Sequence, residues 1–227
     1  MTTAAETDWA LLASQAWATA SLSPWHFSQI FARTLDQHDT GQPVKRFPNR
    51  PHLRALCELW ASNRLLFIEK SRQMLVTWWA SMLALWCVLF RRGQLIFLQS
   101  KRLEDVVGNE YTGDGLLGRA KFLLAHMPFR AYVLPPLGIV SNAESITVRA
   151  NDSAIQAIPQ GGDKIRSHTV TGLISDETAI QEEFAEAFSA SMASIRRGWA
   201  VWITTPHLVD GGQSMRVCRN LPEEAPG

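Results

Sequence analysis

The sequence predicts an α/β fold in which helices flank a mostly parallel central sheet, preceded by a helical segment at the N-terminus. Three observations support this. Short apolar runs at 65–68, 94–99, 170–175 and 200–204 alternate with longer stretches of helical periodicity. The runs are almost continuously apolar, which is typical of strands buried on both faces of a parallel sheet. Finally, 46% of the 227 residues are hydrophobic, so the chain can bury the core of one domain.

The N-terminal segment, 1–44, is predicted to be helical and to pack on the core. Residues 6–20 place apolar side chains at helical spacing. Ser23 and Pro24 then provide a cap and a first turn for a second helix, which we expect to run through Leu35. The segment carries no catalytic signature.

The core is predicted at 45–220, with a short tail or linker at 221–227. Along the chain we expect a helix at 52–61, a strand at 65–68, a helix at 76–90, a strand at 94–99, a loop at 109–118, a helix at 119–126, a hairpin of strands at 145–149 and 154–158, a polar loop at 159–168, a strand at 170–175, a helix at 182–195 and a last strand at 200–204.

Composition argues against several classes of protein. The net charge of +1 gives no overall basic field for nucleic acid, although positive charge can still be local. Cys57, Cys87 and Cys218 form no CxxC pair and are expected to be reduced thiols of an intracellular protein. No HExxH motif indicates zinc. The first residues lack a basic stretch, so a signal peptide is not expected.

Two stretches allow two interpretations. Residues 74–90 are long and apolar enough to suggest a membrane span, but they include Thr77 and Ser81 and lie at the short limit, which favours a buried helix. Residues 45–51, KRFPNRP, carry three cations that could contact nucleic acid or only solvate a surface loop. The loop is favoured because isolated basic clusters are usually surface features.

The segment after the first core strand has the position of a phosphate-binding loop. Aligning Thr77 with the final hydroxyl of GxxxxGK[ST] puts Val76 at the lysine, Leu75 at the second glycine and Lys70 at the first glycine. The match is poor, yet a flexible Lys70 could reach a phosphate from the opposite rim of the loop, with Thr77 as a magnesium ligand. The alternative is a plain strand–turn–helix with a solvated lysine, which the bulky Leu75 favours.

Two other strands also end in polar residues. The strand 170–175 is followed by Asp176 and Glu177, where one carboxylate could hold Mg²⁺ and the other activate water. Acids favoured at the start of a helix are the alternative. The strand in VWITTP ends in Thr204 and Thr205, whose hydroxyls could sense a phosphate or mark a simple strand end.

These motifs together resemble a known family. Three motifs follow one another along the chain: SRQ before a helix that starts at a threonine, then LISDE, then ITTP. Their order and separations are similar to those in the ATPase domain of the large terminase subunit. That domain is the motor that packs DNA into capsids of tailed phages and herpesviruses. The resemblance covers roughly residues 45–210 and implies a RecA-like P-loop ATPase fold with ATP and Mg²⁺ as cofactors.

The resemblance also implies roles for individual residues. Nucleotide binding would fall to Lys70, Ser71, Arg72, Gln73, Met74 and Thr77 of the Walker A loop, with Thr77 and Asp176 on Mg²⁺, Glu177 in hydrolysis, and Thr204 and Thr205 in coupling. His52 is the nearest equivalent of the family's adenine-reading glutamine. ATP-driven rings need a cation from a neighbouring subunit, and Arg119 is the first candidate for it, with Arg166 as the second. The alternative for each is a surface arginine without this role.

The function implied is ATP hydrolysis that drives double-stranded viral DNA into a procapsid. Implied partners are DNA, a portal protein, a small terminase subunit and further copies in a ring, in the host cytoplasm and without a membrane. The family's nuclease domain is not found here. A helicase-type ATPase and a nucleotide-binding or assembly module with little hydrolysis are the alternatives, the latter because Leu75 and Val76 replace the usual Gly and Lys.

Overall fold

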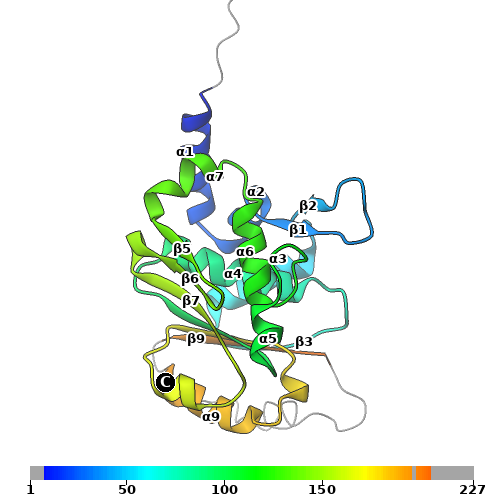
Figure 1. The fold of residues 1–227 in the computed structure, drawn as a ribbon, viewed down its shortest axis with the longest axis vertical. Helices are drawn as coiled ribbons and strands as arrows, with labels where there is room; N and C mark the ends of the chain where they lie inside the picture. The colour runs from blue at the N-terminus through cyan, green and yellow to red at the C-terminus, as the bar shows by residue number, and fades with distance from the viewer. Residues whose placement is uncertain (1–7, 196–197, 206–227) are drawn as a thin grey trace, which may run out of the picture.

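The computed structural model describes residues 8–195 and 198–205 (Figure 1). Pro206, Cys218 and the expected tail at 221–227 lie outside the described residues. A central sheet crosses the molecule, with helices on both sides of it (Figure 1). The predicted α/β class with a mostly parallel, helix-flanked sheet is confirmed.

In the part of the chain that the structure describes, seven strands form the central sheet in the order β3-β9-β8-β4-β7-β6-β5. Their bounds are β3 Leu65–Glu69, β9 Trp199–Thr204, β8 Gly172–Ser175, β4 Leu95–Gln99, β7 Ser153–Ile158, β6 Ser145–Val148 and β5 Ile139–Ser141. The first five run parallel, and β6 and β5 add an antiparallel edge. The predicted hairpin at 145–158 is therefore confirmed.

The helices lie close to their predicted positions. Their bounds are α1 Trp9–Ser21, α2 Pro24–Ile30, α3 Pro51–Ser62, α4 Val76–Phe90, α5 Leu103–Val107, α6 Leu116–Ala125, α7 Arg130–Val133, α8 Asp163–Arg166 and α9 Phe184–Ser194, with 3₁₀ turns η1 Pro135–Leu137, η2 Arg149–Asn151 and η3 Thr178–Ile180.

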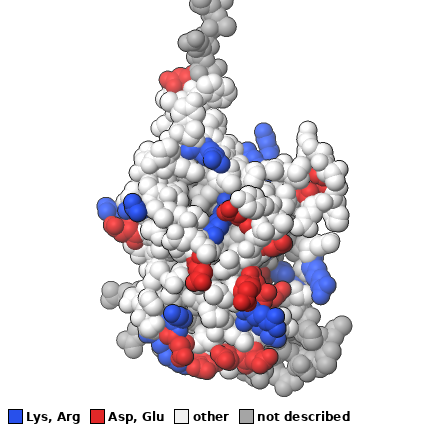
Figure 2. All heavy atoms as spheres, in the orientation of Figure 1, with Lys and Arg blue, Asp and Glu red and all other residues white. Residues whose placement is uncertain are grey.

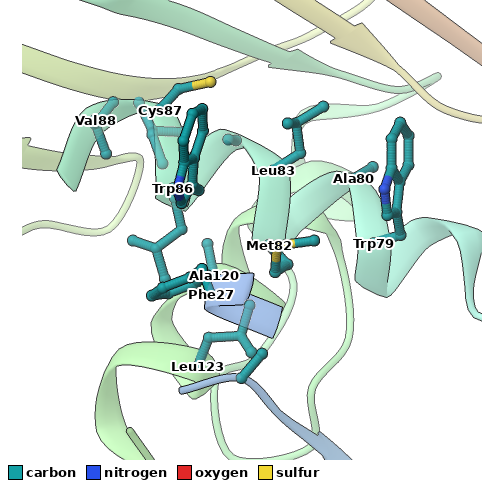
Figure 3. Packing of buried hydrophobic residues seen from close by; sticks show 14 of the residues in the cluster. Phe27, Trp79, Ala80, Met82, Leu83, Trp86, Cys87, Val88, Ala120 and Leu123 are labelled. Carbon is teal, nitrogen blue, oxygen red and sulfur yellow. The ribbon is translucent and has the colours of Figure 1, made fainter. Parts of the chain in front are cut away.

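Helix α4 is the centre of the larger core. Every residue from Trp78 to Leu89 is buried, so this helix is apolar on all sides because protein surrounds it. Figure 3 shows Phe27 of α2 with Ala120 and Leu123 of α6 grouped on one side of it. Among the described residues, no helix has the length and apolarity required to cross a bilayer. Residues 76–90 thus form the buried helix that was expected.

A smaller core covers the opposite face of the sheet. Phe97, Leu173 and Trp202 project from the strands and pack with Phe184 and Phe188 of α9. Trp202 and Phe188 have ring centroids 4.9 Å apart. Because both faces are covered, the strands need side chains that are apolar on both sides, which explains their continuous apolar runs.

The helices α1 and α2 pack on the larger core. The Trp86 indole N–H of α4 donates to the Ala20 carbonyl at 3.0 Å. Trp17 of α1 lies against Phe90, with ring centroids 4.4 Å apart. These contacts join the first helices to the central one.

Cys57 and Cys87 are buried free thiols. Burial raises the pKa of Cys57 to about 11 and that of Cys87 to about 12. Both thiols therefore stay protonated at neutral pH, which is typical of buried structural cysteines.

Three boundaries were predicted wrongly. The second helix does not reach Leu35, because it stops at Ile30 and the chain enters β1, Arg33–Leu35. This strand pairs with β2, Val44–Arg46, so tertiary pairing overrides local helical spacing. The polar loop at 159–168 contains α8, and α6 begins at Leu116, inside the loop predicted at 109–118.

Candidate functional site

Three neighbouring parallel strands bring distant motifs to one edge of the sheet. Strand β9 lies between β3 and β8, and the three strands run in the same direction. Their carboxyl ends therefore meet at one edge, where open α/β sheets bind ligands. Lys70 follows β3, Thr204 ends β9, and Asp176 follows β8.

Lys70 is held against the end of β9. Its backbone N–H donates to the Thr204 carbonyl at 2.9 Å, and its Nζ donates to the Thr205 hydroxyl at 3.1 Å. The Thr204 hydroxyl in turn accepts from the Ala179 N–H at 3.0 Å. The threonines thus connect the lysine to the segment that follows the acid pair.

The loop from Lys70 to Val76 makes a tight turn without glycine. Gln73 and Leu75 have φ values of 62° and 59°, in the left-handed region that glycine adopts most easily. Leu75 is also the N-cap residue of α4 and packs against the larger core. Leu75 therefore supplies the backbone conformation that the usual glycine provides, at the cost of strain.

The acid pair lies beside the start of α4. The Thr77 hydroxyl donates to Asp176 Oδ2 at 2.8 Å, and the Glu177 N–H donates to Asp176 Oδ1 at 2.8 Å. Asp176 is only 6% exposed, so its carboxylate is fixed by these two donors. The hydroxyl and the carboxylate predicted to share a metal are therefore in direct contact.

Glu177 occupies an unfavourable environment for a negative charge. Burial raises the pKa of its carboxyl, and the nearby charges of Asp176 and Asp105 raise it further, while Lys70 and Arg119 lower it. Its backbone is also left-handed, with φ of 56°. Strained, partly buried acids of this kind cluster at functional sites.

A cavity of about 480 Å³ opens between these segments. Its volume falls in the range of small-ligand sites. Its lining comprises Lys70, Arg72, Gln73, Met74, Leu75, Val76, Thr77, Trp78, Arg119, Glu177, Ala179, Ile180, Thr204 and Thr205. An adjoining hollow shares Lys70, Thr77, Arg119 and Glu177 with it and adds Asp176.

Arg119 lies inside the cavity of its own chain. Its guanidinium carbon is 5.5 Å from the centroid of the Trp78 ring, and Nη1 donates to the Gly115 carbonyl at 3.3 Å. Its buried Nε has no hydrogen-bond partner. Arg119 was expected to reach a neighbouring subunit or to lie on the surface, but this position places it beside its own acid pair.

These residues fit a magnesium-bound polyphosphate. Lys70 and the partly unsatisfied Arg119 are cations facing one cavity, and the Thr77–Asp176 pair offers two hard oxygen ligands. No cluster of three or more His, Cys, Asp or Glu that could hold a metal occurs among the described residues. Mg²⁺ seldom has an all-protein cage and is usually completed by phosphate oxygens and water, which agrees with this donor set.

The remaining predicted residues are divided between the loop and other parts of the fold. Ser71 is exposed on the loop and does not line the cavity. His52 Nε2 is 3.1 Å from the Met74 carbonyl, so His52 fastens α3 to the loop and is absent from the cavity lining. Arg166 pairs with Asp163 and Glu186, outside that lining.

Sequence reasoning missed a buried network behind the acid pair. The Gln181 side-chain amide donates to the Asp176 carbonyl at 2.7 Å and to Ser175 Oγ at 3.0 Å. Ser175 Oγ donates to Gln99 Oε1 at 3.2 Å. A glutamine at the end of an apolar strand, as Gln99 is, was the available signal, since polar residues there face the ligand edge.

Comparison with known proteins agrees with this geometry. No family model and no curated protein matches the sequence significantly. Among solved structures, the fold is similar to the HK97 bacteriophage large terminase, with a TM-score of 0.63 and 10% identity over 88% of this chain and 40% of that one.

The large terminase ATPase domain of Thermus phage P74-26 is also similar. Its TM-score is 0.53, with 19% identity over 71% of this chain and 66% of that one, and a mutant of it gives 0.54. The chain thus spans less than half of one large terminase and about two thirds of an isolated ATPase domain. The resemblance seen in the sequence is confirmed in the fold, and the chain has the fold of the ATPase domain of phage large terminases.

Proposed function

We propose that this chain is an ATP-hydrolysing motor domain of a large terminase, which drives double-stranded viral DNA into a procapsid. One observation carries the proposal: Lys70, Thr77 and Glu177 face a common cavity, and Asp176 is bonded to Thr77 at its rim. The fold shared with terminase ATPase domains supports it.

Each side chain has a role that its position suits. Bound Mg²⁺ and ATP would supply the polarised γ-phosphate that water attacks. Thr77 and Asp176 would hold the metal, while Lys70 would neutralise the phosphates from the start of the loop. Glu177 would orient the water and accept its proton, and the raised pKa of this carboxyl makes it a better proton acceptor.

The other loop residues would complete the nucleotide site. Arg72, Gln73 and Met74 line the cavity. Ser71 would contribute through the backbone of the loop, and His52 would act by holding the Met74 carbonyl. Thr204 and Thr205 would couple changes at the phosphate to β9. Thr205 is hydrogen-bonded to Lys70, and Thr204 is hydrogen-bonded to the Ala179 N–H after the acid pair.

The whole assembly is part of the same proposal. The partners would be double-stranded DNA, a portal protein, a small terminase subunit and further copies of the chain in a ring on the procapsid. Arg166, which stands outside the cavity lining, is the residue available for a contact with a neighbouring copy. The host cytoplasm would be the place of action.

Phosphate release from ATP and Mg²⁺ tests the proposal. Lys70→Ala should reduce turnover by about 100-fold or more, because it removes a cation that stabilises the transition state. Lys164→Ala, an exposed lysine on α8, is the matched control and should turn over ATP like the wild type. Normal turnover by Lys70→Ala would remove Lys70 from its role.

A nucleotide-binding module with little hydrolysis is the second candidate. It is favoured by Val76, which stands where the usual lysine lies and lines the cavity. Fluorescent ATP binding measured beside phosphate release separates the two. Tight binding with no phosphate release, with or without DNA, would support the module and contradict the motor.

A further inference from the structure

The β1–β2 ribbon carries two arginines directly opposite each other. Arg33 of β1 and Arg46 of β2 are cross-strand partners in the antiparallel register. Like charges in this position destabilise a ribbon, since their side chains share one face. Burial lowers the pKa of Arg33, and the nearby charge of Arg46 lowers it further.

No carboxylate in the described residues relieves this repulsion. Arg33 Nη1 donates to the Ile30 and Ala32 carbonyls at 3.3 and 2.7 Å, which are neutral acceptors. Arg46 forms no ion pair with any described residue. Of the two acids between Arg33 and Arg46, Asp39 pairs with Lys45 and Asp36 accepts the His38 N–H at 3.0 Å.

A third arginine continues the basic surface. Arg50 is exposed, has no ion pair within the described residues, and is the N-cap residue of α3, where no side chain caps the helix. It follows Arg46 by four positions in the chain, so the two Cα atoms lie within about 14 Å. Residues 33–54 contain five Lys or Arg and two Asp, a surplus of three cations in a chain whose net charge is +1.

We propose that the β1–β2 ribbon and the start of α3 bind the phosphate backbone of duplex DNA through Arg33, Arg46 and Arg50. Phosphates between the opposed arginines would relieve their repulsion. The choice of DNA as the polyanion rests on the proposed motor function. The ribbon would hold the backbone without reading sequence, as phosphate contacts do.

The rest of the visible surface is less suited to a polyanion. Figure 2 shows most of the Asp and Glu side chains of this face over its lower half, where α5 and α9 lie, with Lys and Arg side chains beside them. This region includes Glu182, Glu183 and Glu186. Two of them form ion pairs, Glu182 with Lys101 and Glu186 with Arg166. DNA held by the ribbon would lie away from these acids.

The binding of a fluorescent duplex of arbitrary sequence tests this site. Affinity is measured by anisotropy from about 50 to 200 mM salt, where each phosphate contact contributes about 0.9 to the slope of log K against log salt. Arg46→Ala should lower the slope by about one and Arg46→Ala with Arg50→Ala by about two, on every duplex sequence. Arg46→Lys keeps the charge and should restore the slope.

The control is Arg92→Ala, an exposed arginine that pairs with Asp152 at the other end of α4. It should leave the slope at the wild-type value. An equal loss in Arg92→Ala, or an unchanged slope in the double variant, would overturn the ribbon site. Failure of the wild type to bind duplex at about 50 mM salt would also overturn it.

ATP turnover without DNA distinguishes this site from the proposed function. Arg46→Ala should hydrolyse ATP at the wild-type basal rate, because Arg46 does not line the cavity. A wild type that binds DNA through the ribbon but releases no phosphate would contradict the motor and leave the ribbon in place. A wild type that releases phosphate but does not bind DNA through the ribbon would overturn the ribbon site alone.

Discussion

Glu177 shows how one residue can be costly to the fold and useful to the site. Its carboxyl lies partly buried next to Asp176, and both burial and that neighbouring charge raise its pKa. The left-handed backbone at Glu177 adds strain. Both features lower stability, and features of this kind cluster at functional sites.

The raised pKa of Glu177 makes a prediction about stability and pH. The folded state holds this proton more tightly than the unfolded state, whose glutamate pKa is about 4.3. The resulting stabilisation is complete below that pKa and is lost as the pH rises through the higher folded value. Glu177→Gln cannot ionise, so it should melt above the wild type at pH 7.5, with the difference shrinking as the pH falls towards 4.

Melting curves of both proteins across this pH range check the prediction. Glu144→Gln, which also removes one negative charge but at an exposed position away from the cavity, is the control. A Glu177→Gln variant that melts below the wild type at pH 7.5 would show that ionised Glu177 stabilises the fold. ATP turnover by this variant should be lost at every pH.

The loop from Lys70 to Val76 is the element in which sequence rules and structure conflict most. Glycine usually supplies positive φ in such loops, yet here Gln73 and Leu75 adopt it. The conformation is imposed by the elements on either side: β9 fixes Lys70 through the Thr204 carbonyl, and α4 begins immediately after Leu75. The His52 contact with the Met74 carbonyl holds the loop from a third side.

Substitutions at Gln73 should measure the strain in this loop. Left-handed backbone costs a non-glycine residue about 1–2 kcal/mol, and glycine loses about 0.5–1 kcal/mol through its freer unfolded chain. Gln73→Gly should therefore leave the free energy of unfolding unchanged or raise it by up to about 1.5 kcal/mol. Gln73→Val should lower it by about 1–2 kcal/mol, since β-branched residues avoid this region.

Denaturant unfolding gives these values, with Gln73→Ala as the matched control. Alanine removes the side chain while keeping a β-carbon, so it should stay close to the wild type. Equal stabilities for the glycine and valine variants would show that position 73 does not hold positive φ in solution.

At the scale of the whole molecule, the described chain already contains the cations that the cavity needs. Lys70 and Arg119 both face it from within one chain. Burial lowers the pKa of Arg119, while the charges of Asp176, Asp114 and Glu177 raise it. For the proposed ATP site, we therefore expect that no cation from a second copy is needed.

Turnover at concentrations where the chain is monomeric tests this completeness. Arg119→Ala should reduce turnover by about 100-fold or more in the monomer, and equally in an assembly, because the side chain acts within its own site. Arg92→Ala is the control for loss of an exposed arginine. If Arg119→Ala lost turnover only in the assembly, Arg119 would instead act in the site of a neighbouring copy. If Arg166→Ala lost turnover only in the assembly, Arg166 would be the residue that acts in the neighbouring copy.

Much of the fold followed from local pattern. Continuous apolar runs indicated β3, β4, β8 and β9 to within about two residues, because a strand covered on both faces must be apolar at every position. The start of α4 was equally clear. Residues 33–35 were assigned to a helix because nothing local to them reveals their partner strand.

The sequence by itself determined the class of the fold and the residues at the ends of its strands, because both depend on periodicity and on residue type. Only the tertiary structure decided that β9 lies between β3 and β8, which brings Lys70 to Thr205 and Thr77 to Asp176. It also decided that Arg119 turns into its own site and that Arg33 faces Arg46. These relations join residues far apart in the chain, and their energies arise only when packing brings the side chains together.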